Sequence, residues 1–103
     1  MEIFYFKNTG NAFNFAFEKW LDANETIILK MPVVSANKRG VNDIGWISNG
    51  DVRIYGTFSE NPRSNEALWQ EINVNDEINK TTSALKIENR GDRCKIEMRA
   101  ILN

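Results

Sequence analysis

Residues 43–58 read DIGWISNGDVRIYGTF, two β-rich runs that flank Asn49-Gly50. Asn-Gly in this setting is the strongest short-range signal for a β-hairpin, because a type I′ turn needs positive φ at both central residues. In the second run, the residues on one face are apolar: Val52, Ile54 and Phe58. The residues on the other face are polar apart from one tyrosine: Asp51, Arg53, Tyr55 and Thr57. This alternation predicts a strand with one buried side.

The C-terminus repeats the pattern around Arg90-Gly91-Asp92. Alternate residues of the last run are apolar: Cys94, Ile96, Met98, Ala100 and Leu102. The residues between them are charged: Arg93, Lys95, Glu97 and Arg99. Leu85 and Ile87 supply the matching apolar face of the run before the turn. We therefore predict a second hairpin with Arg90-Gly91-Asp92 at its tip. The tripeptide resembles the integrin-recognition motif, although a glycine between two solvated charges is ordinary turn chemistry.

The first half of the chain is less regular. Residues 2–7 are apolar on both faces, which predicts a strand buried on both sides. Residues 25–34 predict a strand that ends at an edge or bulge, because Pro32 cannot donate to a ladder. Residues 12–21 fit both a strand and a helix. We expect a strand to about Phe17 and then a helical turn that ends near Asn24.

These elements predict an all-β protein. Seven to eight short antiparallel strands at regular spacing, with turn signals between them, are typical of a β-sandwich or jelly roll. The chain has 103 residues, of which 42% are hydrophobic and 26% charged. That length and composition indicate one globular domain spanning residues 1–103.

Composition argues against several classes of function. The 13 Lys+Arg balance 14 Asp+Glu, so we expect binding neither to nucleic acid nor to a membrane. The chain has no histidine and one cysteine, which removes the usual nucleophilic and zinc sites. We therefore expect no enzymatic activity and no catalytic, cofactor-binding or metal-binding residues; a metal-independent pair of carboxylates, whose spacing in three dimensions the sequence hides, is the remaining enzymatic alternative. Asp76-Glu77 is the densest acidic point and is interpreted as a solvated turn. The N-terminus does not resemble a signal peptide.

Aromatic residues are the remaining candidates for a binding surface. Seven of the 11 lie within the first 20 positions. We predict that these seven and one further ring contact partners: Phe4, Tyr5, Phe6, Phe13, Phe15, Phe17, Trp20 and Tyr55. The alternative, that the seven N-terminal rings lie in the protein's own core, stays open at this point. So does a platform for stacking sugars, for which the candidates are Trp20, Trp46, Trp69 and Tyr55.

Three segments carry a resemblance to a known class of proteins. They are IGWISNGDVRIYGTFSENP (44–62), ALWQEINVNDEINKTTSALKIEN (67–89) and the terminal MRAILN (98–103). Their order of strands and turns resembles small phage-encoded virion β-sandwich proteins, which serve as capsid decoration (cement) proteins or as head and tail fibre components. The resemblance implies a structural, non-enzymatic protein that is assembled in the host cytoplasm and forms homo-oligomers on a particle. A carbohydrate- or receptor-binding module is the alternative function.

Overall fold

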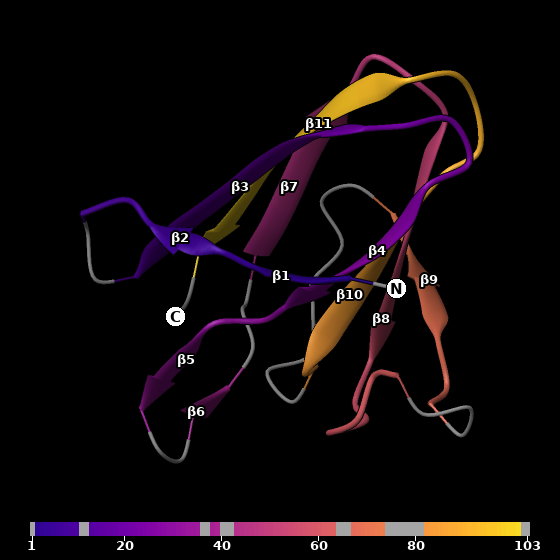
Figure 1. Cartoon of the computed structure of the whole chain (residues 1–103). Helices are drawn as coiled ribbons and strands as arrows, with labels where there is room; N and C mark the ends of the chain where they lie inside the picture. Colours follow the sequence, from indigo (N-terminus) through magenta and orange to yellow (C-terminus); the bar gives the residue numbers. More distant parts are fainter. Residues whose placement is uncertain are drawn as a thin grey trace.

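The structure is a computed structural model, and it describes residues 2–10, 13–35, 38–39, 43–63, 67–73 and 82–101. Within these ranges the chain forms strands and turns but no helix. Nine strands make two sheets, and two further short strands pair with each other (Figure 1). The predicted all-β class is therefore confirmed, with nine strands in the two sheets where seven or eight were expected.

Each sheet takes strands from both halves of the chain. The five-stranded sheet has the order β1 (Ile3–Tyr5), β4 (Thr26–Lys30), β10 (Ala84–Asn89), β8 (Val52–Thr57) and β9 (Gln70–Ile72). The four-stranded sheet has the order β2 (Lys7–Asn8), β3 (Asn14–Leu21), β11 (Cys94–Ile101) and β7 (Asp43–Ser48). The separate pair is β5 (Val33–Ser35) with β6 (Lys38–Arg39). All pairs are antiparallel except β1 with β4.

The core lies between the two sheets. Its buried cluster draws on both: Leu21, Ile44, Ile96, Met98 and Ala100 from the four-stranded sheet, and Ile27, Leu29, Ile54, Leu85 and Ile87 from the five-stranded sheet. The alternation read from the last run is correct, since its apolar positions are buried from Cys94 to Ala100. Leu102 lies outside the described residues.

The N-terminal segment closes one side of the sandwich. β1 pairs with β4 in one sheet, and after Phe6 the chain crosses to pair with β3 in the other. Figure 1 shows this segment crossing the front of the molecule, between the two sheets. The prediction of a strand buried on both sides is wrong here, because β1 is an edge strand and Tyr5 is 68% exposed.

Both predicted hairpins are wrong. β7 and β8, which flank Asn49-Gly50, lie in different sheets, and so do β10 and β11, which flank Arg90-Gly91-Asp92. Each turn is a corner that carries the chain from one sheet to the other. Among the described residues only Asn24 and Gly10 have positive φ, so Asn49-Gly50 forms no type I′ turn. Gly50 is needed for a different reason: a Cβ there would lie 2.7 Å from Cβ of Cys94.

A buried asparagine joins two of the corners. The side-chain amide of Asn89 donates to the backbone oxygens of Leu21 (3.3 Å), Asp22 (2.9 Å) and Asp92 (2.9 Å). Its oxygen accepts from the backbone nitrogen of Gly91 at 3.0 Å. Asn89 thereby ties the β3–β4 turn to the β10–β11 turn, and its own polar atoms are satisfied inside the protein.

Three local predictions need correction. β3 runs unbroken to Leu21, and the expected helical turn is a β-turn in which Glu25 donates to the oxygen of Asp22 and Asn24 takes the left-handed conformation. Phe58, predicted to face the core, follows the end of β8 and is exposed. Leu68 is also exposed: residues 67–72, whose sequence predicts a short strand or a bridging segment, form a strand only over Gln70–Ile72.

Candidate functional site

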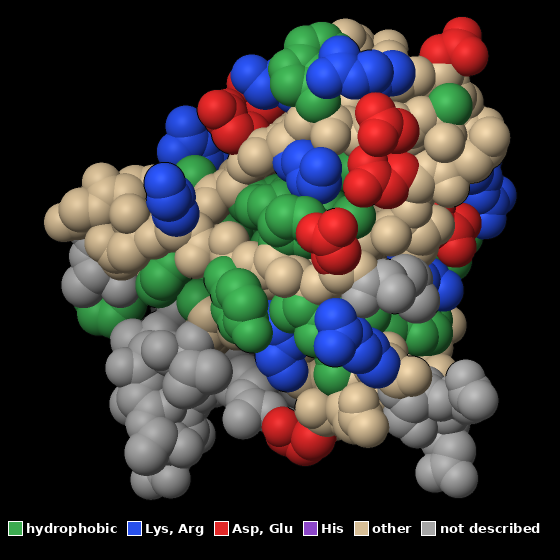
Figure 2. Space-filling view, viewed as in Figure 1, with side chains coloured by type: hydrophobic (Ala, Val, Ile, Leu, Met, Phe, Trp, Pro, Cys, Tyr) green, Lys and Arg blue, Asp and Glu red, His purple; other side chains and the backbone are tan. Residues whose placement is uncertain are grey.

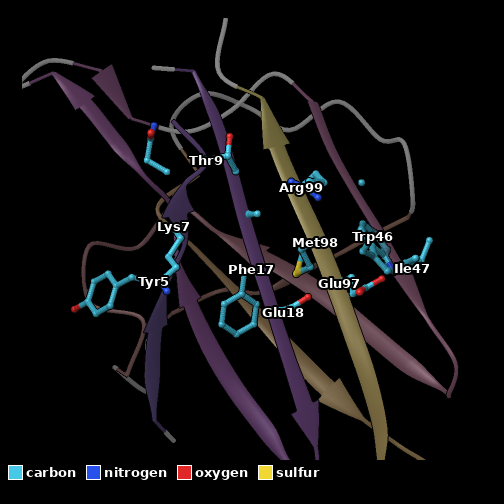
Figure 3. Close-up of a pocket in the computed structure, with 13 residues that line it drawn as sticks. Tyr5, Lys7, Thr9, Phe17, Glu18, Trp46, Ile47, Glu97, Met98 and Arg99 are labelled. Carbon is cyan, nitrogen blue, oxygen red and sulfur yellow. The ribbon is translucent and has the colours of Figure 1, made fainter. Parts of the chain in front are cut away.

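The outer face of the four-stranded sheet carries an open trough of about 1130 Å³ (Figure 3). Strand register places the side chains of its floor in two rows across the sheet. One row contains Lys7, Ala16, Arg99 and Gly45. The next row contains Glu18, Glu97 and Ile47. We call these the basic row and the acidic row. They are neighbours on this face because side chains two residues apart on a strand point the same way.

The acidic row brings two carboxylates together. Glu18 on β3 is directly opposite Glu97 on β11, an arrangement that destabilises a sheet when nothing compensates it. Lys95 compensates part of the repulsion, with Nζ 3.7 Å from Glu18 and 3.5 Å from Glu97. One cation therefore serves two carboxylates, and the row keeps a net negative charge.

The basic row has cations and open space. Within the described part of the chain, no carboxylate lies within 4.0 Å of the Lys7 or Arg99 side-chain nitrogens. Arg99 stands between the small residues Ala16 and Gly45. A Cβ added to Gly45 would meet no atom within 4 Å. The row therefore offers an exposed guanidinium that a carboxylate from another molecule can reach.

Apolar side chains surround the two rows. Of the seven large hydrophobic residues that are exposed in the described part of the chain, four lie on this face or at its rim: Tyr5, Trp20, Ile47 and Ile101. On the neighbouring side of the sandwich, where β1 and β2 cross between the two sheets, Figure 2 likewise shows apolar side chains reaching the surface among Lys, Arg, Asp and Glu side chains. Exposed apolar side chains interspersed with charges are typical of surfaces that bind other proteins.

The outer face of the five-stranded sheet differs, because several of its charged side chains have partners within the chain. Nζ of Lys86 lies 4.9 Å from the ring centre of Tyr55 and 5.1 Å from that of Trp69. Arg53 pairs with Asp51 and Glu71. These contacts raise the pKa of its guanidinium, and the hydrogen bond to Glu71 is the largest cause. These contacts leave the face with little unmet charge.

The tripeptide Arg90-Gly91-Asp92 lies at the corner between β10 and β11. Its arginine is held by the protein itself, since Nε donates to Glu88 at 3.1 Å and Nη2 donates to the hydroxyl of Tyr55 at 2.6 Å. An integrin-type contact would require Arg90 to leave both partners.

The structure divides the residues predicted to contact partners. Four pack against the core: Phe4, Phe6, Phe15 and Phe17. Three are exposed: Tyr5, Phe13 and Trp20. Tyr55 lies half-buried on the other sheet, beneath Lys86. Only Tyr5 and Phe17 line the trough, whose two charged rows were not predicted as a site. The outward direction of Glu97 and Arg99 was visible in the sequence, but their neighbours on β2, β3 and β7 were not.

The sugar platform is not assembled. Lys86 lies over the rings of Tyr55 and Trp69, and the guanidinium of Arg93 lies 4.7 Å from the ring centre of Trp20. Trp46 packs against the core. A sugar would have to displace a cation from each of the first three rings before stacking on the covered face.

No three or more His, Cys, Asp or Glu side chains gather into a possible metal site among the residues that the structure describes. Asp76-Glu77 lies outside those residues. Nor does any described segment form a helix of the length and apolarity needed to cross a membrane. Comparison with known proteins found no matching family model, no matching curated protein and no matching solved structure.

Proposed function

We propose that the protein is a non-enzymatic structural subunit of a phage virion that docks on other virion proteins, as a capsid decoration protein or a fibre component. The observation that carries this proposal is the outer face of the four-stranded sheet. It combines exposed apolar side chains, such as the 68% exposed Ile47, with the cation of Arg99, which has no carboxylate partner among the described residues. A structural subunit needs such a face because its function is permanent contact with other chains.

The scaffold suits this role. Sandwiches hold side chains of one face in fixed register, and β3 and β11, which both contribute to the two rows, are paired over eight residues. A rigid face loses little conformational entropy on docking, which favours association. The virion assignment itself rests on the sequence resemblance over residues 44–62, 67–89 and 98–103.

The test is whether the chain is a component of particles. Virions released from the organism that encodes it should be purified by density gradient and analysed by mass spectrometry for the chain at a fixed ratio to the major capsid protein. Replacing Ile47 by Asp on the docking face should remove the chain from the particle fraction. The matched control, Leu68→Asp, introduces the same charge at an exposed leucine that does not line the trough. A chain found only in host lysate and never with particles would contradict the proposal.

A carbohydrate- or receptor-binding module is the second candidate. One observation favours it: the exposed ring of Tyr5 lines the trough beside the polar side chains of Asn8 and Thr9, which also make hydrogen bonds within the β2–β3 loop. An aromatic face beside hydrogen-bonding groups is the usual composition of a sugar site. Binding to an array of bacterial surface glycans that is lost in Tyr5→Ala would support it.

A further inference from the structure

We infer that the outer face of the four-stranded sheet binds the same face of a second copy of the chain, related by a two-fold axis. The argument begins with the two charged rows. They are adjacent and of opposite sign, and they lie about 7 Å apart because two residues of a strand span that distance. A face with adjacent bands of opposite charge is complementary to itself once it is turned end to end.

The required axis is defined by the strands. It lies in the interface, perpendicular to β3 and β11, and passes between the two rows. Rotation about it places the basic row of each copy over the acidic row of the other. In β11 this brings Arg99 over Glu97 of the second copy, and the same contact recurs on the other side of the axis. An axis parallel to the strands would instead place each row over its own copy and bring like charges together.

Shape supports the same axis. A twisted sheet is saddle-shaped, and a two-fold axis in the interface and perpendicular to the strands superposes the saddle on its copy with an even gap. The concave diagonal of one face then receives the convex diagonal of the other. Sheets packed in this way have nearly aligned strands, as in a sandwich.

The five-stranded sheet is a poorer surface for this contact. Most of its charged side chains are paired within the chain: Arg53 with Asp51 and Glu71, and Lys86 and Arg90 with Glu88. By contrast Arg99 lacks a carboxylate partner among the described residues, and Glu18 and Glu97 share a single lysine. Pairing two copies would give each Arg99 a carboxylate and each Glu97 a second cation.

The size of the face predicts a modest affinity. Its longest strands have eight residues, about 27 Å at 3.4 Å each, and four strands span about 19 Å. The resulting area of roughly 500 Å² falls below the ~800 Å² that each partner buries in a standard interface. We therefore expect a micromolar dimer in free solution, strengthened where many copies are held on one particle. The inference names a second copy of the chain as the partner on the face that the proposed function uses for docking, and it rests on that function for the gain from many copies on one particle.

The test is a charge exchange measured by sedimentation equilibrium of the full chain from about 1 μM to 1 mM. Arg99→Glu and Glu97→Arg should each raise the dimer Kd at least about tenfold, because each brings like charges together twice. The double variant, in which the two charges have changed places, should return to within about threefold of the wild type. Arg53→Glu is the matched control on the other sheet and should leave the Kd unchanged. High salt should weaken the wild-type dimer.

Three outcomes overturn the inference: a wild-type chain that is monomeric throughout, single variants that dimerise as the wild type does, or a double variant that does not recover. Circular dichroism of each variant confirms that the exposed substitutions leave the fold intact. A monomeric chain that is nevertheless a component of particles would remove the dimer and leave the proposed function standing.

Discussion

Alternate residues of the strands differ sharply in what they contribute to stability. Ile54 and Ile96 are 1% and 0% exposed, whereas Arg53, the neighbour of Ile54, points to solvent. We expect Ile54→Ala and Ile96→Ala each to lower the free energy of unfolding by about 2–5 kcal/mol, because both leave a cavity in the core. Arg53→Ala should change it by less than about 0.5 kcal/mol, since exposed ion pairs contribute little. Urea titration measures all three, and equal losses would show that the strand register is wrong.

Two glycines of the β7–β8 region, Gly45 and Gly50, differ in how much space surrounds them. A Cβ at Gly50 would lie 2.7 Å from Cβ of Cys94, whereas a Cβ at Gly45 would meet nothing within 4 Å. We therefore expect Gly50→Ala to destabilise the protein by about 1–3 kcal/mol through overpacking. Gly45→Ala should be neutral, or stabilising by up to about 1 kcal/mol through a smaller unfolded-state entropy. Thermal unfolding of the two variants decides the point. A tolerant Gly50 would mean that the corner against β11 is looser than the structure shows.

At the scale of elements, the two turns show what alternation can and cannot predict. Alternation identifies which residues of a strand face the core, and it did so for β10 and β11; in β8 it was right for Arg53 and Ile54, but Thr57, predicted on the polar face, is only 2% exposed. The same pattern arises whether two consecutive strands lie side by side in one sheet or face each other across the core. Asn49-Gly50 favoured the first arrangement, but the close approach of Gly50 to Cys94 explains that glycine equally well. Pairings between distant segments, such as β11 with β3, leave no local signal.

Crosslinking distinguishes a corner from a hairpin. Arg53 of β8 and Glu88 of β10 are directly opposite each other, so their Cα atoms lie within the range that a disulfide spans. In a Cys94→Ala background, Arg53→Cys with Glu88→Cys should oxidise readily. Glu88→Cys with Lys95→Cys should stay reduced, because these residues face outward from opposite sheets, which stack about 10 Å apart. Electrophoresis without reductant reads both results. If Glu88→Cys with Lys95→Cys formed the disulfide and Arg53→Cys with Glu88→Cys did not, β10 and β11 would be paired in a hairpin around Arg90-Gly91-Asp92.

At the scale of the whole molecule, the N-terminal third shows why the candidate site was only partly predictable. The density of aromatic residues there indicated a special role, and two explanations, interface and core, fitted equally well. The structure assigns the rings to both: Phe4 and Phe6 lie near Phe17 with ring centres 6.0 and 6.4 Å away, while Tyr5 points outward. Choosing between them requires knowing that the chain crosses from one sheet to the other at Phe6, and no local pattern contains that information.

This crossing makes the N-terminal segment a connection between the two sheets, so its removal should destabilise the edge of each sheet. Deleting residues 1–8 removes the pairing of β1 with β4 and of β2 with β3. We expect hydrogen exchange to accelerate at the backbone amides of β3 and β4 together, because both strands become sheet edges. If the deletion prevents folding, Phe6→Ala tests the same connection with a smaller change. It should lower the free energy of unfolding by about 1–3 kcal/mol, less than for a fully buried phenylalanine.

Tyr5→Ala is the control for this experiment, since it truncates an exposed ring in the same segment. We expect it to change stability by less than about 0.5 kcal/mol and to leave exchange in both sheets unchanged. Faster exchange confined to β4 after the deletion would mean that the segment belongs to the five-stranded sheet alone. The contact of Phe6 with Phe17, a residue of β3, argues against that outcome, because it ties the segment to the four-stranded sheet beyond the two residues of β2.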